Sequence, residues 1–184
     1  MPGTDMIMIM SNWRTIFHDG IPVSLPASTS LFRREDKVRR MFLILSGSLN
    51  LERCLRDGDP LVLKRAGAGT LLAEASLFAD RYHCDAIACE PSELLALPKK
   101  VTLERLHANP ASSVAMVAET SKEVQHLRAR IEILRLKRVS DRLDAWLELF
   151  DVPAKGRWVD VAEAIGVTPP ALYRELARRR AARE

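Results

Sequence analysis

The chain has 184 residues, 47% of them apolar, which is enough for one full domain and a small second one. Its formal net charge of +4 is compatible with a polyanionic partner but is not diagnostic of one. No apolar run reaches the roughly 18 residues that a membrane helix needs, and the first ten residues lack the basic region and the long apolar region of a secretory signal. The three cysteines form no C-x-x-C pair, so we expect reduced thiols, a cytoplasmic protein and no membrane partner.

Residues 21–98 are typical of short strands separated by turns. The Asp57-Gly58 pair, inside residues 56–60, favours a tight hairpin, because it readily takes positive φ angles. No long helical pattern separates the apolar segments, so we expect an antiparallel sandwich or barrel and not a parallel α/β fold. The predicted strands lie in residues 42–45, 49–54, 61–63, 85–89 and 94–97.

A long helix is predicted to begin at Asn109-Pro110, because neither glycine nor proline occurs from Ala111 to Val152. One set of side chains within it repeats at the a and d spacing of a heptad, flanked by charges. This pattern predicts a two-stranded coiled coil and hence a homodimer, although the same helix packed on its own barrel is an alternative. The seam residues are Val117, Thr120, Val124, Leu127, Ile131 and Leu134.

A second helix is predicted near residues 139–150, and residues 158–180 then have the spacing of a helix-turn-helix. Ala162 supplies the small residue that lets two helices cross closely, and Gly166 supplies the positive φ of the turn. Thr168 is expected to cap the second helix of the pair, with Pro169 in the first turn, where a missing N–H costs little.

The second helix of this pair is the predicted DNA-reading element. Its N-terminal residues would approach base edges in the major groove. Arg174 is the best candidate for base recognition, because its planar fork fits O6 and N7 of guanine, and Tyr173 suits a phosphate or a thymine methyl. The basic end is expected to contact phosphates. The candidate DNA-binding residues are Thr168, Pro169, Pro170, Tyr173, Arg174, Arg178 and Arg179.

The order of these segments, together with several stretches of sequence, resembles the cyclic AMP receptor protein / FNR family of transcription regulators. The stretches are residues 42–51, 74–78, 141–143, 165–169 and 172–174. The resemblance implies an α+β protein with a cyclic-nucleotide-binding-like β-roll (a jelly roll), a long dimerisation helix and a C-terminal helix-turn-helix. The expected domains are residues 1–108 for the sensor, 109–138 for the dimerisation helix and 139–184 for DNA binding.

Nucleotide binders of this family carry Gly-Glu followed later by Arg-Ser or Arg-Thr, for the ribose and the phosphate. Here Ala73 replaces the glycine, Glu74 is kept, and His83-Cys84 stands where Arg-Ser is expected. Without a charged bidentate partner a phosphate loses a strong interaction, so cyclic AMP is not expected. The effector-pocket candidates are Glu74, Arg81, His83 and Cys84, and neither effector nor cofactor is identified. An N-terminal cysteine cluster for iron–sulfur binding and the histidine ligand of haem-bearing relatives are both missing.

The thiols and His83 allow two interpretations. In the first, Cys54 and Cys89 are small buried residues and His83 lies on a surface loop. In the second, a soft metal or redox sensor uses Cys54, His83, Cys84 and Cys89. Cys84 and Cys89 have opposite parity along a strand, so both cannot face inward without a bulge.

The leading hypothesis is therefore a dimeric regulator that binds double-stranded DNA and responds to an effector other than cyclic AMP; the resemblance adds RNA polymerase as a partner. The chain ends at Glu184, so the family's full β-hairpin wing is not expected, and Pro169-Pro170 removes two backbone donors. The alternative is a sensing or interaction module whose helix-turn-helix does not read DNA. No catalytic motif is present, so an enzyme is not expected.

Overall fold

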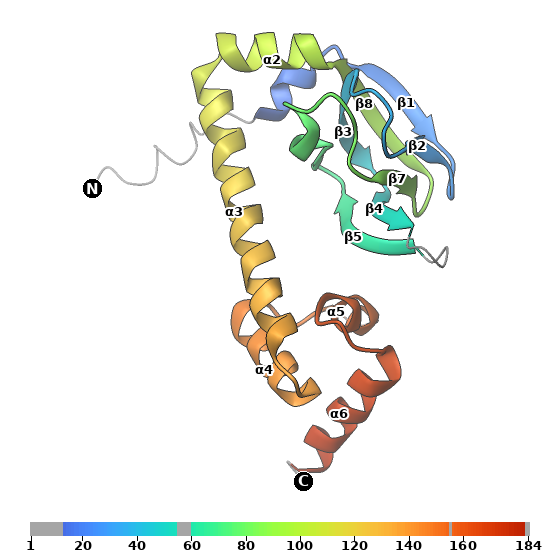
Figure 1. Cartoon of the computed structure of the whole chain (residues 1–184), viewed down its shortest axis with the longest axis vertical. Helices are drawn as coiled ribbons and strands as arrows, with labels where there is room; N and C mark the ends of the chain where they lie inside the picture. Colours follow the sequence, from blue (N-terminus) through green and yellow to red (C-terminus); the bar gives the residue numbers. More distant parts are fainter. Residues whose placement is uncertain (1–12, 55–59, 155, 183–184) are drawn as a thin grey trace, which may run out of the picture. The chain divides into compact units, whose positions relative to one another are not determined.

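The computed structural model describes residues 13–54, 60–154 and 156–182, and it forms two compact units, residues 1–116 and 117–184. Figure 1 shows the first unit as a β-roll with short helices and the second as a group of helices. The predicted hairpin turn at residues 56–60 lies almost entirely outside the described residues. No described helix is both long and apolar enough to cross a membrane.

The first unit contains two four-stranded antiparallel sheets, ordered β1-β8-β3-β6 and β2-β7-β4-β5. The strands are β1 (Ile21–Leu25), β2 (Ser30–Phe32), β3 (Arg40–Ser46), β4 (Ser48–Cys54), β5 (Pro60–Gly67), β6 (Leu71–Leu72), β7 (Asp85–Ala88) and β8 (Ser92–Pro98). The β-roll with helices confirms the predicted α+β class.

Alternation along the strands explains how the β-roll closes its core. Leu49 and Leu51 of β4 pair with Ala88 and Ala86 of β7, and all four side chains are buried. Because successive strand residues point to opposite faces, every second residue of these strands lies in the core. The 3₁₀ helix η1 (Trp13–Phe17) adds Trp13 and Phe17, and it packs beside α2 (Lys99–Ala108) at one end of the roll (Figure 1).

Each predicted strand is present, whereas β1, β2, β6 and α2 were not predicted. β1 contains a proline and β6 has only two residues, so neither shows a strand pattern. The long helix begins as predicted, because the Asn109 Oδ1 accepts the Ser112 N–H at 3.1 Å and so caps α3 (Pro110–Arg135).

The second unit contains the rest of α3 with α4 (Val139–Leu149), α5 (Trp158–Ala164) and α6 (Pro169–Ala181). Its core brings together one or two residues from each helix and Ile165, which follows α5: Ile133, Leu143, Val161, Ala162, Ile165 and Leu172. Aromatic contacts extend this core, since the Trp146 ring stacks on Phe150 with centroids 5.7 Å apart and lies 6.4 Å from Trp158. The small unit is therefore held by a shared core and not by helix propensity.

Candidate functional site

Helices α5 and α6 form the predicted helix-turn-helix. Ala162 is completely buried where the two helices meet, and the Val167 N–H donates to its carbonyl at 2.9 Å. Gly166 has φ +66°, and a Cβ placed there would lie 2.6 Å from Cδ2 of Leu134. The positive φ therefore favours glycine in this turn, and a larger residue would also displace the Leu134 methyl.

Arg142 of α4 joins the turn of the helix-turn-helix to the end of α3. Its guanidinium donates to four backbone carbonyls, at 2.8 to 3.2 Å: those of Leu134, Leu136, Ile165 and Gly166. Carbonyls at a helix end have no partner within the helix, so one side chain satisfies the ends of two helices. Sequence analysis missed this role, although Arg142 lies in a family-like stretch; its partners are distant in sequence.

The start of α6 differs from the prediction in one detail. Thr168 occupies the N-cap position with extended backbone, but its hydroxyl makes no capping hydrogen bond. Its carbonyl instead accepts the N–H groups of Ala171 and Leu172 at 3.0 and 3.1 Å. Pro169 and Pro170 fill the first two helical positions, so the donors that a cap normally satisfies are largely absent.

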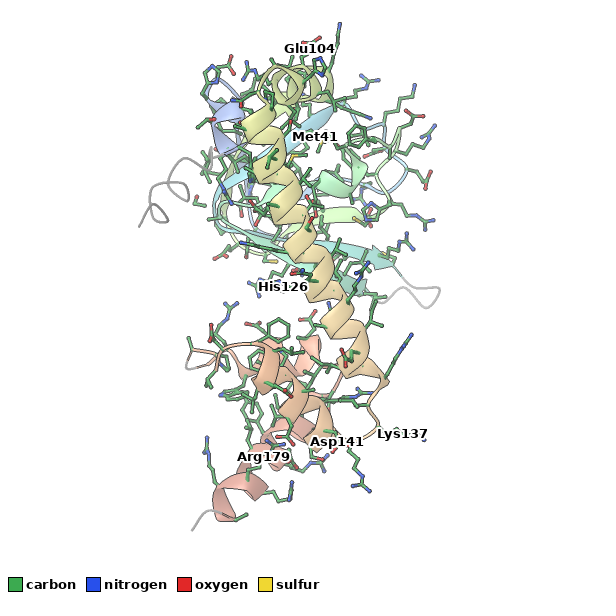
Figure 2. All side chains as sticks on the ribbon, turned by 90° about the vertical axis from the view of Figure 1, so that its left-hand side faces the viewer. Met41, Glu104, His126, Lys137, Asp141 and Arg179 are labelled. Carbon is green, nitrogen blue, oxygen red and sulfur yellow. The ribbon has the colours of Figure 1, made fainter. Side chains whose placement is uncertain are left out.

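The basic end of α6 is engaged within its own unit. Figure 2 labels Arg179 among the helices of this unit. Arg179 pairs with Asp144 at 2.6 Å and with Glu175 at 2.7 Å, and its side chain is only 23% exposed. Arg178 pairs with the same Glu175 at 2.7 Å. Hydrogen bonds from Arg178 and then Arg179 lower the pKa of Glu175 to about 2. These arginines are therefore part of the fold, whereas the exposed Tyr173 and Arg174 have no described ion pair.

In the β-roll, Glu74 begins the 3₁₀ helix η2 (Glu74–Ser76). Ala73 precedes it with φ +69°, a left-handed conformation that favours glycine, which is the family residue here. The Glu74 carboxylate accepts a hydrogen bond from Lys64 Nζ at 3.2 Å, and both side chains are less than one quarter exposed. The Glu74 carboxylate thus has a cation from β5 beside it.

His83 and Cys84 lie near this carboxylate region. The exposed His83 has Nδ1 3.4 Å from the Ser76 Oγ, and its carbonyl accepts the Arg53 Nε–H at 3.1 Å. Burial, with help from the Asp85 and Glu74 carboxylates, raises the pKa of Cys84 to about 11. The Cys84 thiol therefore stays protonated near neutral pH and is a poor nucleophile or metal ligand.

Arg81 lies apart from Glu74, His83 and Cys84. Its side chain is exposed and donates from Nη1 to the Glu35 carbonyl at 2.5 Å. It lines a pocket on the loop between β2 and β3, whose walls include none of the other three effector candidates. The structure thus brings Cys84 within electrostatic range of Glu74, and it places His83 next to Ser76 of η2. Arg81 is separated from these residues.

The first interpretation of the cysteines is wrong in part. Cys54 is exposed and Cys89 is half-buried, whereas Cys84 is the buried thiol. Cys84 and Cys89 do not both face inward, as predicted, because Cys84 shares the inward face of Ala86 and Ala88 and Cys89 does not. β4 leaves the core before Cys54, which explains its exposure. Among the described residues, no group of three or more His, Cys, Asp or Glu side chains is placed to hold a metal ion.

The seam residues of α3 remain at the surface of their unit. The exposed fractions of the large apolar members run from 39% at Leu134 to 61% at Val117, and Thr120 is also exposed. Only Ile133 of this stretch is buried, in the core with α4, α5 and α6. Most of the a/d face therefore lies away from the face of Ile133 that enters this core, while Leu134, at the end of the seam, also approaches Gly166.

Comparison with known proteins agrees with this architecture. Residues 22–109 match the cyclic nucleotide-binding domain family. The global nitrogen regulator of Nostoc sp. is 28% identical over 163 residues, covering 80% of this chain and 73% of that protein. The corresponding regulator of Synechocystis sp. is 27% identical over 165 residues, covering 81% and 73%. Both relatives are named as global regulators.

Solved structures share the fold at lower identity. FixK2 from Bradyrhizobium japonicum has a TM-score of 0.69 at 14% identity, covering 89% of this chain and 85% of that one. The c-di-GMP responsive regulator CLP of Xanthomonas campestris has 0.67 at 19%, covering 93% and 91%. Residues 22–109 are thus a cyclic nucleotide-binding domain, and the neighbours of the whole chain in sequence and structure are transcription regulators of the Crp/Fnr type.

Proposed function

We propose that the protein is a homodimeric regulator that binds double-stranded DNA through α6 and is controlled by an effector held in the β-roll. The observation that carries the proposal is the complete helix-turn-helix, with Ala162 and Gly166 at the crossing, tied by Arg142 to the end of α3. That same helix carries the exposed apolar seam. A dimer formed along the seam would place two reading helices in one molecule.

The dimer rests on the cost of leaving the seam in water. Val117, Val124, Leu127, Ile131 and Leu134 repeat at heptad spacing, and each is at least 39% exposed. Burying one such side chain completely contributes roughly 1.5–3 kcal/mol, and a second copy of the helix offers an identical stripe. Thr120 would be a weak point in this seam.

DNA recognition rests on the exposed side chains of α6. Arg174 offers a free guanidinium fork for a guanine edge, and Tyr173 is 46% exposed beside it. Thr168, Pro169 and Pro170 would approach the duplex through shape, because the prolines lack backbone donors. Arg179 would act chiefly by holding α6 against α4, since it pairs with Asp144, whereas Arg178 pairs within α6, with Glu175, and could still reach a phosphate.

The effector would differ from cyclic AMP. Glu74 pairs with Lys64, the His83-Cys84 pair offers no permanent charge, and Arg81 lines another pocket. None of Glu74, His83 and Cys84 supplies a bidentate cation for a cyclic phosphate, and the neighbouring Arg53 guanidinium already donates to the His83 carbonyl. We also propose RNA polymerase as a partner, a cytoplasmic location, and a division into sensor (1–108), dimerisation helix (109–138) and DNA-binding part (139–184).

Selection of bound sequences from a random DNA pool, followed by fluorescence anisotropy, tests the function. The wild type should enrich a near-palindromic site with half-sites about one helical turn apart. Arg174→Ala should cost about 1–3 kcal/mol of binding free energy at that site and weaken the base preference at one position. Arg174→Lys is the matched control, because it keeps the charge and loses the fork, so nonspecific binding should survive while the base preference falls.

A wild type that enriches no sequence would contradict the proposal. It would favour a sensing module whose helix-turn-helix does not read DNA. Two observations favour that second function to a lesser degree: the Pro169-Pro170 start of α6, and the engagement of Arg178 and Arg179 within the fold.

A further inference from the structure

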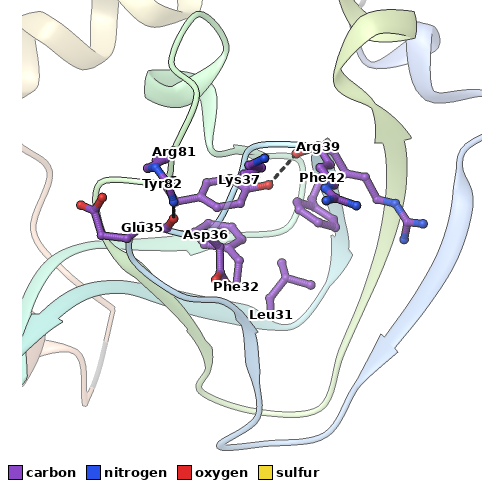
Figure 3. A pocket seen from close by; sticks show the side chains of 10 residues that line it. Leu31, Phe32, Glu35, Asp36, Lys37, Arg39, Phe42, Arg81 and Tyr82 are labelled. Carbon is purple, nitrogen blue, oxygen red and sulfur yellow. Dashed lines mark hydrogen bonds between the residues drawn. The ribbon is translucent and has the colours of Figure 1, made fainter.

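A pocket of about 600 Å³ lies on the β-roll between the β2–β3 loop and the segment that contains Arg81 and Tyr82 (Figure 3). This volume falls within the range of roughly 300–1,000 Å³ that small-molecule sites occupy. Four cations and two carboxylates line it, over an apolar floor. The lining residues are Leu31, Phe32, Glu35, Asp36, Lys37, Arg39, Arg40, Phe42, Arg81 and Tyr82.

The two carboxylates in the lining have partners outside it. Asp36 Oδ2 accepts the backbone N–H of Arg33 at 2.9 Å, and Glu35 Oε1 lies 3.6 Å from Arg34 Nε. By contrast, none of the four lining cations forms an ion pair with any residue that the structure describes. The pocket therefore holds an excess of positive charge that the fold does not neutralise.

The cations are also brought together against their mutual repulsion. Lys37 and Arg81 face each other across an isolated antiparallel bridge, although they are 44 positions apart. Like charges directly opposite across strands are destabilising. Within the protein Arg81 Nη1 donates to the Glu35 carbonyl, and the bridge sets Lys37 beside it, so that both side chains can donate to an anion between them.

The backbone that carries these side chains is held firmly. Glu35 N–H donates to the Tyr82 carbonyl at 2.9 Å, and Tyr82 N–H donates to the Asp36 carbonyl at 3.0 Å. The Tyr82 hydroxyl donates to the Arg40 carbonyl at 2.8 Å (Figure 3), and its ring stacks on Phe32 with centroids 3.8 Å apart. The site is thus preorganised, which reduces the entropy lost when a ligand binds.

We propose that this pocket binds a small ligand with two or more phosphate groups, through Lys37, Arg39, Arg40 and Arg81. Guanidinium forks match phosphate oxygens in pairs, and three of the four cations are arginines. The site is separate from the Glu74 region, and the proposal does not depend on DNA binding.

Calorimetric titration of the full chain with inorganic pyrophosphate, at constant ionic strength, tests the site. The wild type should bind saturably with one site per chain, and Lys37→Gln with Arg40→Gln should weaken binding at least about tenfold. The matched control is Arg33→Gln with Arg128→Gln, which removes the same charge from exposed arginines outside the pocket and should change binding less than about threefold. Arg39→Gln provides a second, independent variant with the same expected direction.

Three results would overturn the proposal: no saturable binding of pyrophosphate, equal loss in the pocket and control variants, or tighter binding of citrate than of pyrophosphate. Loss of DNA affinity in the pocket variant without any pyrophosphate binding would instead assign the cations to the DNA backbone. A thermal melt of each variant checks that it is folded.

Discussion

The β-roll and the helical unit differ in which groups they leave exposed: cations without a described carboxylate partner in the β-roll, and apolar side chains in the helical unit. In the helical unit, arginines 178 and 179 have carboxylate partners, while a regular apolar stripe lies exposed on α3. In the β-roll, the exposed large apolar residues are scattered over separate segments, while four pocket cations have no described carboxylate partner. The difference suggests that the helical unit needs an apolar partner and the β-roll an anionic one.

The largest expected effect follows from the apolar stripe. Val124→Asp with Ile131→Asp should convert the dimer to monomers, because two unpaired charges on each chain would enter the seam. Light scattering at micromolar concentration measures the change. The matched control is Glu119→Asp with Glu132→Asp, off the seam, which should leave the dimer intact. Dimers that persist in the seam variant would place the interface elsewhere.

Arg142→Ala should destabilise the helical unit by about 3 kcal/mol, because four backbone carbonyls lose a charged donor. Urea unfolding followed by circular dichroism gives the value. Arg142→Lys should recover only part of the loss, since a single ammonium cannot span carbonyls from two helix ends. A variant as stable as the wild type would show that these hydrogen bonds contribute little.

Arg179→Ala tests whether the basic end of α6 is structural. Removing its pairs with Asp144 and Glu175 should cost about 1–2 kcal/mol of stability. In Arg179→Ala the salt dependence of DNA binding should change little. Arg180→Ala, at an exposed neighbouring position, should instead make the DNA-binding constant depend less steeply on salt concentration. The reverse pattern would mean that Arg179 leaves its carboxylates to contact phosphate.

The same network predicts a dependence of stability on pH. Arg178 and Arg179 hold the pKa of Glu175 at about 2, below its ordinary value of 4.5. A lowered pKa contributes stability above the ordinary value that is lost as pH falls toward the folded-state value. The stability difference between wild type and Glu175→Gln should therefore be largest above pH 4.5 and shrink toward pH 2. A difference independent of pH would contradict this ion pairing.

The smallest effect has the opposite sign. Lys37→Gln should stabilise the β-roll by about 0.5 kcal/mol, because it removes one of two like charges across the bridge to Arg81. The gain should disappear in saturating pyrophosphate, where Lys37 has a partner. Thermal unfolding with and without the anion measures both values, and a loss of stability without the anion would mean that Lys37 is already neutralised.

Patterns within short segments determined much of this protein. Short apolar segments bounded by turn residues predicted β3, β4, β5, β7 and β8. The Asn109-Pro110 start and the absence of breakers predicted α3. Ala162 and Gly166 predicted the helix-turn-helix, since a close crossing and a positive φ are local demands. These features, with the order of the segments, also pointed to the regulator family that the comparisons support.

Only the tertiary structure decided which charged and reactive groups are free. A run of arginines at the end of α6 is the same in sequence whether it faces DNA or Asp144, which lies 35 positions away from Arg179. Arg142 finds its carbonyls up to 24 positions away, and Arg81 meets Lys37 across the β-roll and not Glu74. Ion pairing, thiol burial and pocket lining depend on contacts between distant segments, which no local periodicity encodes.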